Sequence, residues 1–353
     1  MYGGRQPAAV PHAPTRRPQE ASRLVMRVGL VTSGGDAPGM NAAIRAIVRC
    51  GTERGLEILG IHRGFSGLIE GEIEPLDNRA VGGIIERGGT ILRSARSEAF
   101  LTPEGRRRAV DEIGRHGLGG LIVVGGNGSL RGARWLDENV VRAIGIPASI
   151  DNDVPRTEMA IGVDTAINTV VDALNRIRDT AVAHGRAFVI EVMGRKSGYI
   201  ALMGGLAGGA EVILLPELSM ELAEVVDQVL HGVEKGKKHS IIVIAEGFAP
   251  TDHPNPPPSS GRLVAETLEC DGTVETRLTI LGHVQRGGSP SAFDRILACR
   301  FAKEAVDWLA DGRRGAYAGL VGRRILPIPF TSLDEPCGNV DLSLLRLAQT
   351  LAH

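Results

Sequence analysis

Two carboxylates near the middle of the chain have the spacing of an acid–base site. Asp151 and Asp153 are two residues apart, and the hydroxyl of Ser149 precedes them. They follow the apolar run 140–146, which predicts a short buried strand, and open α/β sheets bind ligands where parallel strands end. This position favours catalysis, although Asp151, Asn152 and Asp153 are also residue types that cap helices or form Asx-turns.

Two glycine-rich segments favour phosphate binding. The segments 33–36 and 125–129 each follow an expected strand and open an expected helix. Glycine lets backbone N–H groups approach an anion closely, and the helix N-terminus adds partial positive charge. Each glycine pair taken singly is also typical of a tight turn. The P-loop pattern is absent, which excludes a P-loop enzyme, and the lack of G-x-G-x-x-G weakens the case for a dinucleotide-dependent dehydrogenase.

These three segments together predict a cleft that holds several phosphate groups, an acid–base residue and a metal, with cations close by. Arg195 directly follows an expected buried strand, so we expect it at the same sheet edge as Asp151. His283 is either a core histidine or a donor to a sugar or phosphate oxygen. The other candidate cations are Arg96, Arg186, Lys196, Arg277 and Arg286.

The elements that position these residues alternate between strand and helix. Hydrophobic patterns predict strands at 24–32, 56–62, 118–124, 140–146, 187–192, 211–215 and 240–245. Helices are expected at 40–54, 80–87, 103–116, 130–139, 164–184, 197–206, 219–235, from 262 onward, at 291–310 and near the C-terminus. The segment 249–261 contains five prolines, and we expect a mobile surface loop there. The alternation predicts an α/β fold with parallel sheets.

Composition supports two α/β lobes. The chain has 353 residues, more than one ordinary core requires, and its 47 glycines and 3% aromatic residues suit tight strand-to-helix turns around an aliphatic core. The net charge of −1 argues against a protein that grips nucleic acid.

The cysteines and the termini bear on the cellular compartment. Cys50, Cys270, Cys299 and Cys337 form no C-x-x-C pair, which is typical of a reduced cytosolic protein without a structural zinc. No apolar run is long enough to span a bilayer. We expect residues 1–23 to form a disordered tail rather than a transit peptide, because their prolines would break an amphipathic helix.

From residue 24 onward the chain resembles the ATP-dependent 6-phosphofructokinase family of the bacterial type, the phosphofructokinase A group. The motifs that carry the resemblance are TSGGDAPGMNAAIR at 32–45, RGGT at 87–90, SIDND at 149–153, RDT at 178–180, EVMGR at 191–195 and GHVQRGGSP at 282–290. The resemblance implies two Rossmann-like three-layer α/β/α lobes with mainly parallel sheets and an active-site cleft between them. The larger, nucleotide-binding lobe would comprise 24–162 plus 285–335, and the smaller, sugar-phosphate-binding lobe 163–284 plus 336–353.

The resemblance also implies roles for individual residues. Asp151 would be the catalytic base and Asp153 would lie beside Mg²⁺. Ser149 stands where the family has threonine and keeps the hydroxyl, and Arg195 would brace the transferring phosphoryl group. The residues that would bind ATP are Gly35, Arg96, Ser97, Gly126, Asn127, Gly128 and Ser129.

The sugar-phosphate site would be shared between subunits. Fructose 6-phosphate would contact Ser149, Asp151, Met193, Gly194, Arg195, Glu246, His283 and Arg286 of one subunit. Arg186 and Arg277 would reach in from a neighbouring subunit. A shared site implies an oligomer, in this family usually a homotetramer. The expected activity is that of a cytoplasmic glycolytic kinase (EC 2.7.1.11) with no nucleic-acid or membrane partner.

The donor can be predicted from side-chain size. Family members that use pyrophosphate carry an aspartate and a lysine where this chain has Gly128 and Ala148. Both residues are small and uncharged, so the resemblance favours ATP, with a pyrophosphate-dependent enzyme as the alternative. An effector site for ADP or phosphoenolpyruvate would comprise Arg45, Arg49, Arg178, Glu211, Lys235 and Lys237, while Asn78 replaces a further arginine of the family.

Asn127 is the main departure from the family. It stands where an aspartate helps to hold Mg²⁺, so the oxygen ligand is kept and a full charge is lost. Three outcomes follow: a kinase with weaker metal affinity, an altered metal or nucleotide preference, or a weakly catalytic sugar-phosphate sensor. We expect the first, because Asp151, Asp153 and Arg195 are all present.

Overall fold

The computed structural model describes residues 25–237, 239–253, 259–270, 275–338 and 340–352. The expected tail at 1–23 and the centre of the proline-rich segment 249–261 lie outside these residues. None of the described helices combines the length and apolarity needed to cross a membrane.

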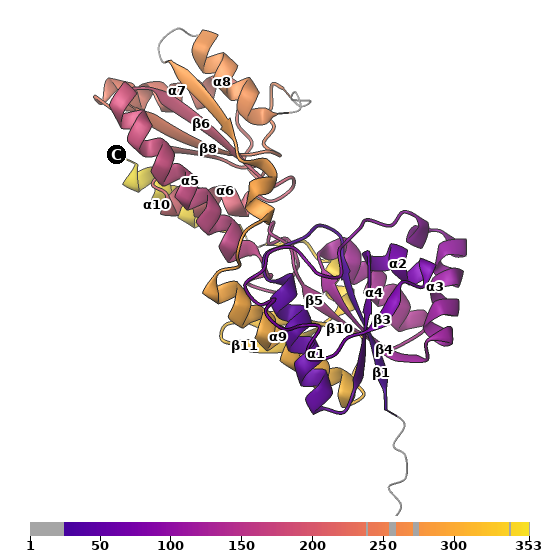
Figure 1. Ribbon diagram of the computed structural model, residues 1–353. Coiled ribbons are helices and arrows are strands. Elements are labelled where there is room, and N and C mark those ends of the chain that lie inside the picture. Colours follow the sequence, from indigo (N-terminus) through magenta and orange to yellow (C-terminus); the bar gives the residue numbers. More distant parts are fainter. Residues whose placement is uncertain (1–24, 238, 254–258, 271–274, 339, 353) are drawn as a thin grey trace, which may run out of the picture.

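The larger lobe contains a sheet with the strand order β11-β10-β5-β4-β1-β2-β3 (Figure 1). Its central strands are parallel, and the outer strands β3 and β11 run antiparallel to their neighbours. The strands are β1 (Arg27–Ser33), β2 (Glu57–Ile61), β3 (Ile73–Pro75), β4 (Leu118–Gly125), β5 (Ala143–Pro147), β10 (Ala316–Val321) and β11 (Arg324–Pro329).

Helices cover both faces of this sheet because successive strand residues point to opposite sides. Leu30 and Ile122 pack in one core with residues of α1 (Met40–Glu53) and α9 (Ala292–Ala310). Val31 and Val123 belong to a second core with residues of α2 (Gly64–Glu70), α3 (Pro103–Arg115) and α4 (Asn127–Asn139). The short helices η1 (Ala99–Leu101) and η3 (Phe330–Asp334) complete this lobe.

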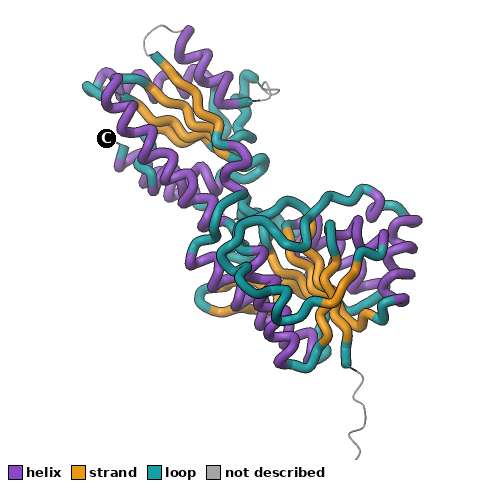
Figure 2. The backbone as a smooth tube through the Cα atoms, in the orientation of Figure 1, coloured by secondary structure: helices purple, strands orange, loops and turns teal. Residues whose placement is uncertain are grey.

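The smaller lobe contains a four-stranded, fully parallel sheet in the order β7-β8-β6-β9. Figure 2 shows its strands in orange with helices in purple beside them. The strands are β6 (Ala187–Val192), β7 (Val212–Leu214), β8 (Ser240–Ala245) and β9 (Thr276–Ile280). The helices are α5 (Val163–His184), α6 (Tyr199–Ala207), α7 (Leu222–Glu234), α8 (Ser260–Cys270), η2 (Gly282–Arg286) and α10 (Leu342–Leu351). The predicted α/β architecture with two lobes is confirmed.

Asp294 ties the lobes together where α5 begins. This buried residue in the first turn of α9 accepts hydrogen bonds from the backbone N–H groups of Gly162, at 2.9 Å, and Thr165, at 2.8 Å. Gly162 is the N-cap of α5 and Thr165 lies in its first turn, and the helix has no cap from the side chain of its N-cap residue. Burial raises the pKa of the Asp294 carboxyl. One carboxylate from the larger lobe therefore caps the first helix of the smaller one.

Several sequence predictions of single elements were wrong. The segment 80–87 is a series of turns rather than a helix, because Gly83 has a φ of 63° and Asp77 Oδ1 accepts the N–H groups of Arg79 and Ala80. The strand expected at 140–146 begins only at Ala143. Helix α8 starts at Ser260, inside the segment expected to be a loop.

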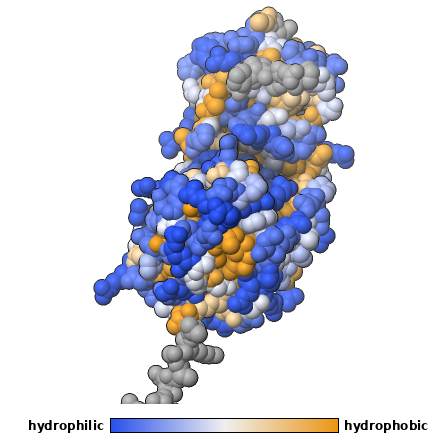
Figure 3. Space-filling view, turned by 90° about the vertical axis from the view of Figure 1, so that its right-hand side faces the viewer, coloured by the Kyte–Doolittle hydropathy of each residue, from blue (hydrophilic) through white to orange (hydrophobic). Residues whose placement is uncertain are grey.

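The surface is mainly hydrophilic on the side of the molecule where α2 and α3 lie. Figure 3 shows that face, with an apolar area on the larger lobe. The large apolar side chains of β1, β4 and β8 are instead buried within the lobes.

Candidate active site

The first glycine loop lies at the carboxyl end of β1 and lines a cavity of about 500 Å³. Gly34 has a φ of 86°, a conformation that favours glycine. A Cβ atom at Gly35 would lie 2.5 Å from Nη1 of Arg286, so the guanidinium group packs directly against the loop. Arg286 Nη1 also donates a hydrogen bond to the backbone oxygen of Asp36 at 3.1 Å.

The second glycine loop is shorter than the sequence predicted. Helix α4 starts at Asn127 rather than at residue 130, so Asn127, Gly128 and Ser129 form its first turn. The N–H groups of a first turn have no partner within the helix and are available to an anion. A Cβ atom at Gly125 would lie 2.5 Å from the backbone oxygen of Ser33, which explains why glycine stands where the two loops meet.

The segment 149–153 follows β5 at the same edge of the sheet. Asn152 is buried, has a φ of 47°, donates to the backbone oxygen of Glu158 and accepts from the N–H group of Ala160. The expected turn-forming role thus belongs to Asn152. The flanking Asp151 and Asp153 line the cavity instead.

Asp151 lies where two cavities meet. It lines both the 500 Å³ cavity and a second one of about 360 Å³, together with Arg96, Asp153 and Arg286. Its Oδ1 atom is buried without a hydrogen-bond partner among the described residues. Burial raises the pKa of its carboxyl, the negative charge of Asp153 raises it further, and the guanidinium groups of Arg286 and Arg195 oppose the rise.

The second cavity lies between the lobes at the carboxyl ends of β6 and β8. Met193 and Arg195 follow β6, and Glu246 follows β8. The N–H group of Glu246 donates to the backbone oxygen of Val192 at 2.8 Å, which fixes the two strand ends together. His283 and Arg286 enter from η2, and Lys196 and Ser197 complete the lining.

The cleft contains positively charged side chains that have no polar partner among the described residues. The side chains of Arg96, Arg195 and Lys196 make no hydrogen bond or ion pair with any described residue, although all three line the second cavity. An unpaired guanidinium or ammonium group beside a cavity suits a phosphate ligand.

The oxygen atoms around Asn127 could hold a hard metal ion. Asn127 Nδ2 donates to the backbone oxygen of Asp153 at 2.9 Å, and its Oδ1 is buried without a partner among the described residues. Ser149 Oγ donates to Asp153 Oδ1 at 3.1 Å. Among the described residues, no group of three or more His, Cys, Asp or Glu could hold a metal alone. The unpaired amide oxygen of Asn127 and the carboxylate of Asp153 fit Mg²⁺ if a ligand supplies further oxygens.

The structure brings most of the predicted site residues together. The first cavity is lined by Gly35, Arg96, Ser97, Gly126, Asn127, Gly128, Ser129, Ser149, Asp151, Asp153 and Arg286. The second is lined by Met193, Arg195, Glu246 and His283 in addition to the shared residues, and Gly194 lies between two of them in the chain.

Arg186 and Arg277 are not part of this cleft. They lie at the amino ends of β6 and β9, whereas Met193 and Glu246 lie at the carboxyl ends of β6 and β8. A strand such as β6 separates its two ends by roughly 20 Å, so neither arginine reaches the cleft of its own chain.

Of the predicted effector residues, Arg178, Glu211 and Lys237 line a third cavity, of about 290 Å³. Arg178 donates to the backbone oxygens of Gly208 and Gly209 at 2.6 and 2.7 Å, and Lys237 Nζ donates to that of Ala352. The other three are not among the residues that line it: Arg45 and Arg49 belong to α1 and Lys235 follows α7.

Sequence reasoning missed the apolar end of the first cavity. Phe65, Phe100 and Leu101 line it, and the rings of Phe65 and Phe100 stack with centroids 4.3 Å apart. Arg106, Arg131 and Gly132 also line this cavity and were likewise not predicted. No local pattern identified these residues, because Phe65 and Phe100 lie in segments for which the sequence predicted no helix or strand.

Comparison with known proteins identifies the family. A family model described as Phosphofructokinase matches residues 27–309. The ATP-dependent 6-phosphofructokinase of Thermotoga neapolitana is 49% identical over 327 residues, which are 92% of this chain and 99% of that protein. The ATP-dependent 6-phosphofructokinase of Natranaerobius thermophilus is 47% identical over 326 residues, again 92% of this chain and 99% of that protein.

Solved structures agree as well. Phosphofructokinase from Saccharomyces cerevisiae matches with a TM-score of 0.82 and 32% identity over 93% of this chain, which spans 48% of the yeast chain. A pyrophosphate-dependent phosphofructokinase from Marinobacter aquaeolei matches with a TM-score of 0.77 at 21% identity, over 90% of this chain and 86% of that one, a likeness of fold alone. The chain belongs to the phosphofructokinase family.

Proposed function

We propose that this protein is an ATP-dependent 6-phosphofructokinase of glycolysis. It transfers the γ-phosphoryl group of ATP to the 1-hydroxyl of fructose 6-phosphate and gives fructose 1,6-bisphosphate and ADP. The observation that carries the proposal is Asp151, a carboxylate with a buried unpaired oxygen where a phosphate-suited cavity meets a second cavity. The names of the relatives from Thermotoga neapolitana and Natranaerobius thermophilus support it.

Asp151 is the general base in this proposal. The 1-hydroxyl oxygen forms a bond to the γ-phosphorus, the bond from that phosphorus to ADP breaks, and the hydroxyl proton passes to Asp151. The raised pKa of Asp151 brings its basicity closer to what proton transfer near neutral pH requires.

Arginines provide most of the remaining catalysis. Phosphoryl transfer depends on positioning and on neutralising the charge of the transferring group. Arg195 and Arg96 have no other partner among the described residues and line the cavity next to Asp151. We assign Arg195 to the transferring phosphoryl group and Arg96 to the phosphates of the nucleotide, while Ser149 helps to place Asp153 through its hydrogen bond.

Mg²⁺ fits beside Asn127 and Asp153. The buried Oδ1 of Asn127 has no partner among the described residues, and oxygen is the ligand type that this ion prefers. Bound there with the donor phosphates, the ion would neutralise their charge. Because Asn127 is neutral, we expect weaker metal binding than a carboxylate at this position would give.

ATP fits the first cavity better than pyrophosphate. Gly128 has open space around the position of a Cβ atom, and Ala148 is small and buried. Phe65, Phe100 and Leu101 also line this cavity, and these apolar side chains suit a nucleobase and not pyrophosphate. The phosphates would lie against the first turn of α4 and the loop at Gly35.

The acceptor would bind in the second cavity against Met193, Gly194, Glu246, His283 and Arg286. Arg186 and Arg277 cannot reach this cavity within one chain, so in our proposal they bind the 6-phosphate of the substrate held by a neighbouring subunit. The working unit is then a homo-oligomer, and we propose a homotetramer.

Regulation and location are further parts of the proposal. The cavity at Arg178, Glu211 and Lys237 would form part of an effector site for ADP or phosphoenolpyruvate, and Arg45, Arg49 and Lys235 would complete it in the oligomer. We place the protein in the cytoplasm, where glycolysis takes place.

The test is a steady-state assay of the purified protein with fructose 6-phosphate, using ATP or pyrophosphate as donor over a range of Mg²⁺ concentrations. We expect turnover with ATP and far less with pyrophosphate. A preference for pyrophosphate would overturn the donor assignment alone. Absence of turnover with both donors at saturating Mg²⁺ would overturn the enzyme assignment and favour a sugar-phosphate sensor.

A further inference from the structure

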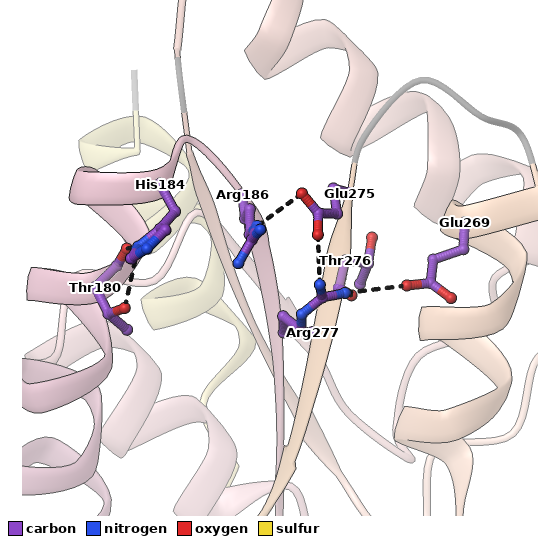
Figure 4. A network of polar contacts seen from close by, with 7 residues as sticks. All are labelled: Thr180, His184, Arg186, Glu269, Glu275, Thr276 and Arg277. Atoms are coloured by element: carbon purple, nitrogen blue, oxygen red, sulfur yellow. Dashed lines mark hydrogen bonds and ion pairs between the residues drawn. The ribbon is translucent and has the colours of Figure 1, made fainter.

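Two arginines at the amino ends of β6 and β9 share one carboxylate (Figure 4). Arg186 Nε donates to Glu275 Oε2 at 2.7 Å, and Arg277 Nη2 donates to Glu275 Oε1. Glu275 immediately precedes β9, and its backbone oxygen accepts the N–H group of Ala187 at 3.0 Å. The backbone of Glu275 is therefore held by the sheet, and its carboxylate is held by both guanidinium groups.

Arg186 and Arg277 differ in their remaining contacts. Arg277 Nη1 donates to the backbone oxygen of Thr276 at 3.0 Å and lies 3.7 Å from Glu269 Oε1. Neither Nη atom of Arg186 has a hydrogen-bond partner among the described residues. His184 is turned away, with its Nδ1 3.0 Å from the backbone oxygen of Thr180. The Nη atoms of Arg186 therefore lie beside the shared carboxylate as hydrogen-bond donors that no described residue uses.

Charge decides what this arrangement can bind. Glu275 and Glu269 balance the two guanidinium groups, so the cluster is formally neutral. The hydrogen bond from Arg186 lowers the pKa of the Glu275 carboxyl, and the positive charges of Arg186 and Arg277 lower it further. Glu275 is therefore ionised at neutral pH. A phosphate dianion that approaches both arginines meets this negative charge at short range, and like charges in such positions oppose binding.

We propose that Glu275 is an internal competitor for the phosphate group that Arg186 and Arg277 bind. Its two oxygens take one hydrogen bond from each guanidinium group, which is also how a phosphate monoester bridges two arginines. An incoming phosphate must take over at least one of these arginines. Glu275 thereby sets how tightly the sugar phosphate binds. This inference rests on the proposed function, in which the two arginines bind fructose 6-phosphate for a neighbouring subunit.

The substitution Glu275→Gln tests the effect of the negative charge of Glu275 alone. Glutamine keeps the size of the side chain and one oxygen that can accept from Arg186, but it loses the negative charge. We expect the KM for fructose 6-phosphate to fall roughly three- to tenfold, the scale of a single charge contact at a partly exposed site. The kcat should stay within about twofold, because the change acts on uniform substrate binding.

Glu266→Gln is the matched control. Glu266 is an exposed glutamate of α8 and undergoes the same charge change, so it corrects for the overall field of the protein. We expect its KM to equal that of the wild type. A purely structural role for Glu275 would raise KM on substitution, so an unchanged or increased KM in Glu275→Gln overturns the proposal.

A second titration separates this inference from the proposed function. Calorimetric binding of inorganic phosphate, without any donor, should be tighter in Glu275→Gln than in the wild type, and Arg277→Ala in the Glu275→Gln background should abolish the gain. Phosphate binding that is no tighter in Glu275→Gln overturns the role of Glu275, whatever the kinase activity. If Arg186→Ala and Arg277→Ala leave the KM for fructose 6-phosphate unchanged, the assignment of the arginines to that substrate fails instead.

Discussion

At the scale of single residues, the central feature is the division of work within 149–153. Asn152 forms the turn through its hydrogen bonds to Glu158 and Ala160, and this leaves Asp151 and Asp153 at the cavities. Three neighbouring polar residues therefore have different tasks. The sequence could not separate them, because the distinction depends on contacts with a segment six to eight residues further along the chain.

Asn127 makes a testable prediction at this scale. Asn127→Asp should lower the Mg²⁺ concentration needed for half-maximal rate, because a carboxylate adds a full charge where the buried Oδ1 now lacks a partner. The measurement is the rate at saturating substrates over a Mg²⁺ titration.

Asn127→Ala is the matching variant and should raise the Mg²⁺ requirement, since it removes the oxygen altogether. Both variants lose the hydrogen bond from Asn127 Nδ2 to the backbone oxygen of Asp153, so that loss cancels in their comparison. An identical metal dependence in both would mean that residue 127 does not contact the metal.

At the scale of elements, the site depends on strand ends and on the caps of the helices that follow. The sequence predicted the loop at 33–36 and the glycine turn at 125–126 because strand, glycine and helix are local patterns, but it placed the start of α4 three residues too late. It did not predict β10, and it did not predict β11. In β11, Pro327, Pro329 and the arginine at its start are typical of a loop, and an antiparallel edge strand tolerates them. It also missed Phe65 and Phe100, which meet only through packing between α2 and η1.

At this scale we predict how much the Asp294 carboxylate contributes to the stability of the fold. Asp294→Ala leaves the N–H groups of Gly162 and Thr165 without their acceptor at the start of α5, and we expect it to lower the free energy of unfolding by about 2–3 kcal/mol. Urea denaturation measures this. Asp341→Ala, which removes an exposed N-cap that accepts the N–H group of Ser343, should cost only about 1 kcal/mol.

The difference in free energy of unfolding between the wild type and Asp294→Ala should change with pH in a defined direction. Because burial raises the folded-state pKa of Asp294 above its unfolded value, the wild type loses stability as the pH rises through the raised pKa. Asp294→Ala has no such group, so the difference in free energy of unfolding between the two proteins should become smaller toward higher pH. A gap that widens as the pH rises would contradict the direction assigned to this pKa.

At the scale of the whole molecule, the two ends of the strands in the small sheet carry different groups of predicted site residues. The carboxyl edge faces the cleft, and the amino edge carries Arg186 and Arg277. The sequence contained this information, because Arg186 precedes its strand whereas Arg195 follows the same strand. How subunits meet depends on surfaces that no local pattern describes, so the oligomer remains a prediction.

Complementation between subunits tests the shared site. Asp151→Ser and Arg277→Ala chains should each be weakly active alone, the first because it lacks the base and the second because it cannot complete its neighbour's site. Hybrid oligomers formed by co-expression should regain activity, since some sites then combine an intact Asp151 with an intact Arg277 from another chain. If hybrids are no more active than the mean of the two parents, both residues act within one chain.

The most direct test of the central claim is the effect of Asp151→Ser on the formation of fructose 1,6-bisphosphate from ATP and fructose 6-phosphate. We predict that kcat falls roughly 10²- to 10⁴-fold, as expected when a general base is lost, while the dissociation constants of both substrates stay nearly unchanged. Equal losses in kcat and in substrate affinity, or a variant that retains wild-type turnover, would contradict the assignment of Asp151 as the base.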